Sequence, residues 1–93
     1  MAEITSNSNV VLAKAIKEIC NAYQEDGDIL AFYRKLAAYK NDIKNNSSAE
    51  LYEKFNCEYR CVYYESLYGD GEYTDHVVNE CIDALETITQ SLL

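Results

Sequence analysis

The chain has 93 residues, 48% of them hydrophobic, and its 16 Asp and Glu residues against 8 Lys and Arg residues give a formal net charge of −8. This length is that of one small domain, and the hydrophobic content is too high for a disordered chain. Because phosphate groups would be repelled, the negative charge disfavours direct binding to nucleic acid or to anionic lipid. The charged partner that we expect is a basic protein surface.

The sequence also carries signals of compartment. No stretch approaches the roughly 20 apolar residues that a membrane helix needs, and residues 1–9 lack the basic and apolar segments of a secretory signal. We therefore expect a cytoplasmic protein with no membrane segment. In that compartment free thiols are expected rather than disulfides. The cysteines are Cys20, Cys57, Cys61 and Cys81.

The chain has no proline and only three glycines, so few positions interrupt a helix. The spacing of its apolar residues predicts four helices, over about 9–25, 28–45, 48–68 and 74–91. Short connections favour antiparallel neighbours, so the predicted fold is all-α: a single up-down-up-down four-helix bundle in one domain, residues 1–93. The predicted caps are Ser8 or Asn9, Asp28, Ser47 (with Glu50 in a capping box) and Thr74 (with Tyr73 and Val78 as a hydrophobic staple).

Negative charge is concentrated at the end of the sequence. Residues 28–46 carry four basic and two acidic side chains, whereas residues 70–93 carry six acidic side chains and no Lys or Arg. A solvated face that keeps the protein soluble is one interpretation. The other is a docking surface for a basic partner, because like charges without interleaved cations raise the cost of folding.

Tyrosine is the second signal, with five of the nine tyrosines between residues 59 and 73. Tyr59 and Tyr63, like Tyr52, fall on the predicted core stripe of the third helix. Tyr64 and Tyr68 project opposite that stripe, beside Cys57 and Cys61. Exposed tyrosines next to carboxylates are typical of an interface. The alternative is a third helix that lies centrally and is buried on two sides.

Metal binding and catalysis are weakly supported by the sequence. Cys57 and Cys61 lie one helical turn apart and could share an ion with His76, but their spacing matches no zinc motif. Cys20 and Cys81 lie on predicted core stripes, so no metal and no other cofactor is predicted. His76 is the only histidine, and the positive start of a helix makes it a poor general base. With no nucleophile elbow and no phosphate-binding glycine loop, we predict no enzyme activity.

These observations predict a small protein-binding module that acts stoichiometrically, as an inhibitor, antagonist or immunity-type protein covering a basic surface of a partner, of which a nucleic-acid-binding site is one example. Phage inhibitors and toxin-immunity proteins are analogies of this kind. One alternative is a self-associating structural or adaptor protein, a homodimer through the third helix. Another is a metal- or thiol-dependent regulator using Cys57 and Cys61. The predicted partner-binding residues are Tyr64, Tyr68, Asp70, Glu72, Tyr73, Asp75, Glu80 and Asp83, and the first six are expected to form one continuous surface.

Overall fold

The computed structural model describes the backbone of residues 2–93 and the side chains of residues 8–93. It contains four helices: α1 (Ala2–Asp26), α2 (Ile29–Asn46), α3 (Ala49–Tyr68) and α4 (Thr74–Leu92). No strand occurs between residues 2 and 93, so the all-α prediction is confirmed. In the same range, none of the helices combines the length and the apolar content needed to cross a membrane.

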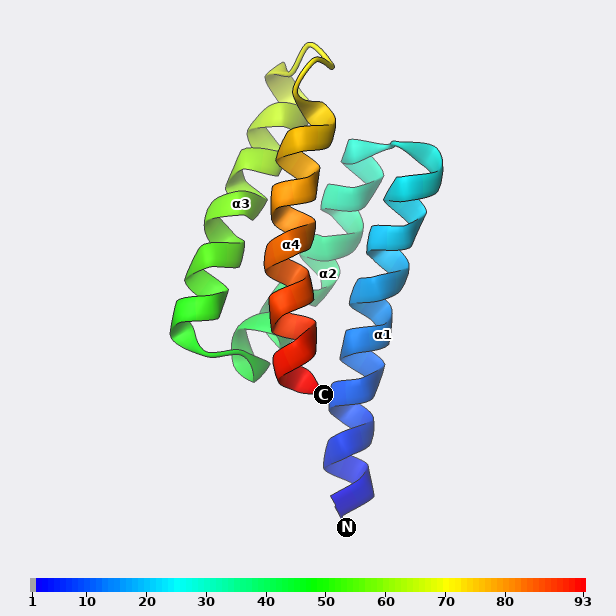
Figure 1. The fold of residues 1–93 in the computed structure, drawn as a ribbon, viewed down its shortest axis with the longest axis vertical. Coiled ribbons are helices and arrows are strands. Elements are labelled where there is room, and N and C mark those ends of the chain that lie inside the picture. Colours follow the sequence, from blue (N-terminus) through cyan, green and yellow to red (C-terminus); the bar gives the residue numbers. More distant parts are fainter. Residues whose placement is uncertain (1) are drawn as a thin grey trace.

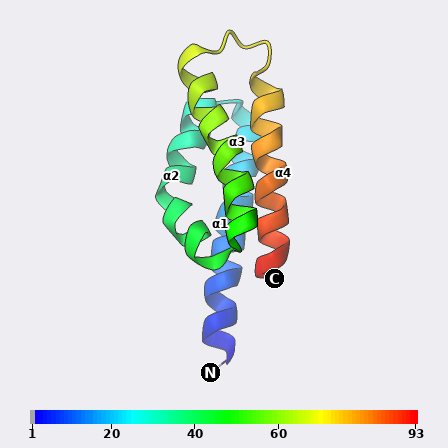
Figure 2. The same ribbon diagram turned by 90° about the vertical axis from the view of Figure 1, so that its left-hand side faces the viewer.

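The helices lie side by side along the long axis of the molecule, and consecutive helices run in opposite directions (Figure 1). The α1–α2 turn and the α3–α4 loop lie at one end, and the α2–α3 turn and the C-terminus lie towards the other (Figures 1 and 2). Helix α3 packs against α2 and α4, as α1 does, whereas α1 and α3 share no contact in the described part of the chain. Helices α1 and α3 therefore form opposite flanks, each with one side facing solvent.

Helix α1 begins earlier than the sequence predicted. It starts at Ala2, so Ser8 and Asn9 lie inside the helix and the prediction that one of them caps it is wrong. The apolar period weakens before residue 10, but no Gly or Pro occurs there to stop a helix. The weakening of the apolar period near residue 10 therefore does not mark the start of α1.

The turn between α1 and α2 is the one that the sequence predicted. Gly27 has a φ of 64°, a left-handed conformation that suits glycine, and its N–H donates to the Tyr23 carbonyl at 2.8 Å. Asp28 then caps α2, because its carboxylate accepts a hydrogen bond from the backbone N–H of Ala31 at 3.1 Å.

The predicted caps of α3 and α4 are wrong, the first for a local reason and the second because of a tertiary contact. Ser48, not Ser47, caps α3 and accepts from the Leu51 N–H at 3.1 Å. The Ser47 hydroxyl instead donates to the Ile43 carbonyl at the end of α2, at 2.6 Å. With the cap at Ser48, Glu50 is one position short of a capping box.

Helix α4 begins at Thr74, preceded by Tyr73, which makes no side-chain cap. The Thr74 hydroxyl donates to the Glu65 carboxylate of α3 at 2.9 Å, so a tertiary contact takes the group that was expected to cap the helix. Tyr73 is 61% exposed while Val78 is fully buried, so the predicted staple does not cover Tyr73.

The core is built from apolar side chains of all four helices, and no polar or charged side chain between residues 8 and 93 is buried. An apolar core of this kind avoids most of the cost of burying unpaired polar groups. Among the side chains described, the Asn56 Oδ1 atom is buried without a hydrogen-bond partner. Among the side chains described, helix α4 contributes the most to this core. The largest fully buried side chains are Ile16, Phe32, Leu36, Ile43, Phe55, Leu85 and Ile88.

The cap assignment at the start of α3 is testable. Ser48→Ala removes the acceptor for the Leu51 N–H, and we expect it to lower the free energy of unfolding by about 1 kcal/mol and the melting temperature by roughly 4–8 °C. Ser47→Ala should cost less, because its hydroxyl binds only a carbonyl of the helix end. Urea and thermal unfolding followed by circular dichroism measure both; a larger loss for Ser47→Ala would contradict the assignment.

Candidate functional site

The outer face of α3 is an exposed stripe that opposes the core. Phe55, Tyr59 and Val62 point inward and are at most 5% exposed. Residues three or four apart share one face of a helix, so burying this stripe turns the opposite one to solvent. The alternative of a central, doubly buried third helix is therefore wrong. The outer face comprises Glu53, Cys57, Arg60, Cys61, Tyr63, Tyr64, Leu67 and Tyr68.

A chain of packed aromatic rings links this face to the core. Tyr33 of α2 stacks on Tyr59 with ring centroids 4.8 Å apart and contacts Tyr63 at 5.2 Å. Tyr63 meets Tyr64 at 5.7 Å, and Tyr64 stacks on Tyr68 at 6.4 Å. Such ring pairs have preferred geometries, so the exposed rings are backed by packed neighbours.

The sequence reasoning missed Tyr63 and Leu67 of the outer face, as it also missed Arg60. Tyr63 was assigned to the core, but it lies at the edge of α3 towards α2, where Tyr33 covers it only in part, and it is 41% exposed. Leu67 is 52% exposed. Leu67 lies four residues after Tyr63 and three after Tyr64, and this spacing could have predicted that it shares their face of the helix.

The acidic surface, defined as Asp70, Glu72, Asp75, Glu80 and Asp83, lies on the α3–α4 loop and on α4. All five side chains belong to exposed residues. In the loop, the Asp70 carboxylate accepts a hydrogen bond from the Glu72 N–H at 2.9 Å, beside Gly71 with its φ of 93°. On α4, Glu80 lies 3.9 Å from the imidazole of His76. The predicted carboxylates are thus held on a short, ordered turn and the helix that follows.

The α3–α4 loop is anchored to α3 through Glu65. Its carboxylate accepts from Thr74, and its carbonyl accepts from the Gly69 N–H at 2.9 Å. A β-carbon at Gly69 would collide with the Glu65 carboxylate, so this close approach requires glycine. The two anchors hold the loop that presents Asp70, Glu72 and Tyr73.

Asp75 has a structural partner that the sequence did not reveal. It accepts a hydrogen bond of 2.6 Å from the hydroxyl of Tyr23, which is 5% exposed and belongs to α1. Burial, and secondly this bond, raise the pKa of Tyr23 well above its usual range. Glu25 and Asp26 at the end of α1 line a polar pocket together with Asp75, so the acidic surface continues onto α1.

The tyrosines and the carboxylates lie on different sides of the α3–α4 pair. Tyr63 leans towards Tyr33 of α2, whereas Asp75 reaches Tyr23 of α1. The two groups approach each other at the loop, where Tyr68, at 79% exposure, and Tyr73, at 61%, flank Asp70 and Glu72. The predicted residues therefore form two surfaces of different chemistry that adjoin at the loop.

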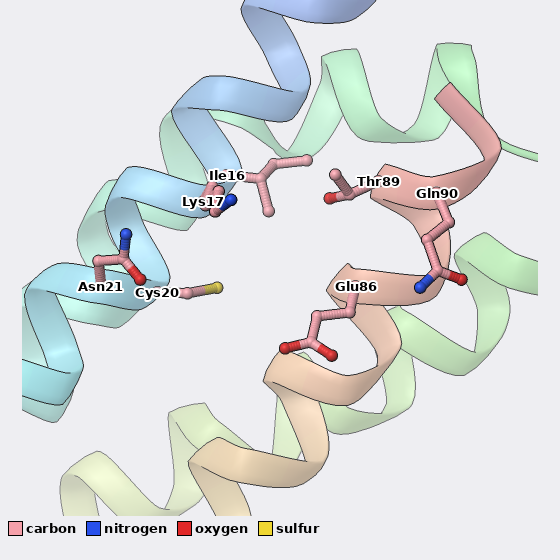
Figure 3. Close-up of a pocket in the computed structure, with 7 residues that line it drawn as sticks. All are labelled: Ile16, Lys17, Cys20, Asn21, Glu86, Thr89 and Gln90. Carbon is pink, nitrogen blue, oxygen red and sulfur yellow. The ribbon is translucent and has the colours of Figure 1, made fainter. Parts of the chain in front are cut away.

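A groove of about 300 Å³ lies between α1 and α4. Figure 3 shows the Cys20 sulfur pointing from α1 towards α4, with Glu86 on the opposite wall. Burial, and secondly the charge of Glu86, raise the pKa of the Cys20 thiol to about 11. The thiol therefore stays protonated at neutral pH, which makes it a poor nucleophile and a poor metal ligand.

All four cysteines are free. Cys20 and Cys81 are buried, as their core positions predicted, whereas Cys57 and Cys61 are exposed. Burial also raises the pKa of Cys81. Among residues for which the structure places side chains, no group of three or more His, Cys, Asp and Glu is arranged to hold a metal ion.

Comparison with known proteins found no matching family model, no similar curated protein and no similar solved structure.

Tyr23→Phe tests the link between α1 and the acidic surface. Loss of the hydrogen bond to Asp75 should lower the free energy of unfolding by about 1–2 kcal/mol at pH 8. The folded-state pKa of Tyr23 is raised above its ordinary 10.0, so its contribution is complete below pH 10 and decreases above it, as the unfolded state loses its proton first. Urea unfolding at pH 8 and pH 11 should show the gap between wild type and variant shrinking.

The matched control is Tyr73→Phe, which changes an exposed ring and should leave stability unchanged at both pH values. A Tyr23→Phe protein as stable as wild type at pH 8 would show that the bond to Asp75 contributes nothing.

Thiol reactivity tests the placement of the cysteines. We expect an aromatic disulfide reagent at pH 8 to label two thiols rapidly in the folded protein and all four after unfolding in urea, because only Cys57 and Cys61 are exposed. The Cys57→Ser/Cys61→Ser protein should show no rapid phase. Rapid labelling of that double variant would place Cys20 or Cys81 at the surface.

Proposed function

We propose that this chain is a non-catalytic protein-binding module that acts stoichiometrically, as an inhibitor or immunity-type antagonist covering a basic surface of another protein. The observation that carries the proposal is the charge of residues 70–93, which hold six exposed carboxylates and no Lys or Arg. A field of one sign steers association with a surface of the opposite sign. Arginines and lysines that hold nucleic-acid phosphates are the cations that closely spaced carboxylates would pair.

The spacing of the acidic surface supports this use. Glu80 and Asp83 are three residues apart on one helix, which separates their β-carbons by roughly 5–6 Å. Glu72 and Asp75 extend the row into the anchored loop, and Glu25 and Asp26 extend it onto α1. Because the backbone that carries these carboxylates is already ordered, binding costs side-chain entropy but little backbone entropy, which favours affinity.

Aromatic contact area adjoins the charges. Tyr68 and Tyr73 are the most exposed tyrosines of the chain and flank the acidic loop. Tyrosine buries a large ring at low entropic cost and keeps a polar tip, and it is enriched at binding hot spots. Tyr64 lies further along α3, at the margin of this surface.

The proposal takes the helices as an antiparallel, up-down-up-down bundle, because that order brings the α1–α2 turn and the α3–α4 loop to one end. Asp28 in that turn adds a further exposed carboxylate. We place the activity in the cytoplasm, where four free thiols are maintained. Neither nucleic acid nor a membrane is proposed as a direct partner, since both are anionic.

The test is capture of partners from a lysate of the source organism on the immobilised chain, at low and high salt. The test variant is Glu72→Gln/Glu80→Gln/Asp83→Asn, which removes three charges of the acidic surface. Asp75 is left unchanged because its carboxylate accepts a hydrogen bond from Tyr23. We expect this variant to reduce the captured basic proteins by roughly tenfold, and high salt to do the same to wild type, because both weaken electrostatic attraction.

A matched control removes the same number of charges elsewhere. Glu18, Asp42 and Glu50 are exposed and lie on α1, α2 and α3. Glu18→Gln/Asp42→Asn/Glu50→Gln should capture as wild type does. Equal capture by both triple variants, or equal loss, would mean that the acidic surface is not the binding site.

A further inference from the structure

Two free thiols lie one helical turn apart on the outer face of α3. Cys57 and Cys61 are both exposed, although cysteine is among the residues most often buried in folded proteins. Neither side chain belongs to the core, to which α3 contributes Phe55, Tyr59 and Val62. Because the two thiols have no packing role, their reactivity is the property that can explain their place on this face.

The spacing of the two cysteines on a regular helix decides what their thiols can do together. Residues four apart on a helix have β-carbons roughly 5–6 Å apart, whereas a disulfide needs β-carbons about 3.5–4.5 Å apart. A disulfide between Cys57 and Cys61 would therefore distort α3, which is one unbroken helix from Ala49 to Tyr68. A metal ion between the sulfurs reaches further, because two metal–sulfur bonds of about 2.3 Å span up to ~4.6 Å. The pair is thus placed to chelate an ion without closing on itself.

We propose that Cys57 and Cys61 form a two-coordinate site for one copper(I) ion. The number of ligands selects the ion. Among the side chains that the structure describes, no third His, Cys, Asp or Glu is grouped with the pair, so the chain does not complete a tetrahedral zinc site. Copper(I) is a soft cation that thiolates select, and two sulfurs hold it in a linear arrangement. Binding releases one proton from each thiol and transfers no electron.

The other thiols and the nearby charges do not change this ligand set. Cys20 and Cys81 are buried, and burial raises the pKa of both thiols, so they stay protonated and unavailable to the ion. The charged side chains of α3 within one turn of either exposed cysteine are Glu53, Lys54, Glu58, Arg60 and Glu65. Three carboxylates and two cations nearly cancel, so the softness of the sulfur ligands, rather than local charge, selects the ion.

This inference does not rest on the proposed function. The two thiols lie on the outer face of α3, whereas the carboxylates that we propose to bind a basic partner lie on α4 and the loop before it. Capture of basic proteins can therefore fail while the thiols bind copper(I), and the reverse also holds.

Competition with a chromogenic copper(I) chelator, under nitrogen and with ascorbate as reductant, tests the site on the full chain. Wild type should withdraw one copper(I) ion per chain from the chelator. Cys57→Ser and Cys61→Ser should each bind the ion on the order of 100-fold more weakly, because the second thiol of wild type acts as an intramolecular ligand at high effective concentration. One equivalent of copper(I) should also abolish the rapid labelling of the two exposed thiols.

The matched control keeps two exposed thiols but separates them. Cys61→Ser/Tyr68→Cys uses a position that is 79% exposed and lies about 16 Å along the helix from Cys57. This variant should bind copper(I) as weakly as the Cys61→Ser protein. Circular dichroism checks that each variant is folded, and sedimentation velocity checks that one chain holds one ion.

Three results would overturn the proposal. The first is a wild type that binds copper(I) no more tightly than Cys61→Ser does. The second is a separated-thiol variant that binds as tightly as wild type, which would mean that helical spacing plays no part. The third is one ion shared between two chains, which would mean that a single chain does not complete the site.

Discussion

Burial of one stripe of α3 is the constraint on which the functional surfaces depend. Phe55, Tyr59 and Val62 fill the space between α2 and α4, and a rigid helix that is held by one stripe has no freedom to bury the opposite one. The same packing that stabilises the core therefore displays Tyr64 and Tyr68 to solvent. An apolar surface kept exposed by the fold itself marks a site of interaction more strongly than scattered apolar side chains do.

The second constraint is the contact between Tyr23 and Asp75. It draws the start of α4 towards α1, while the aromatic rings of α3 continue towards Tyr33 of α2. Tyrosines and carboxylates that follow one another along the chain are thereby separated in space. Asp75, one carboxylate of the acidic surface, also accepts a hydrogen bond from Tyr23. Fewer carboxylates are therefore free to bind a partner than the sequence contains.

The two surfaces are suited to different partners. Carboxylates on α4 and the loop favour a basic surface and act over distance, in a way that salt weakens. The outer face of α3 combines rings, small thiols and both signs of charge, which favours close packing against a surface of matched shape. Tyr68 and Asp70 lie where the two surfaces adjoin.

The sequence by itself determined the all-α class, three of the four helices to within about a residue at each end, and the buried positions of Cys20 and Cys81. These follow from helical periodicity and from glycine positions, which are local properties. Tertiary structure decided that Tyr64 and Tyr68 are exposed, for which the sequence left a buried alternative open, and it decided the use of the Thr74 hydroxyl, the exposure of Tyr63 and the partnership of Asp75. Each of these depends on which side chain of another element lies nearby: Glu65 takes the Thr74 hydroxyl, Tyr33 covers only part of Tyr63, and Tyr23 reaches Asp75 from 52 residues away. Periodicity reports the face on which a residue lies, but it does not report what the neighbouring helix places against it.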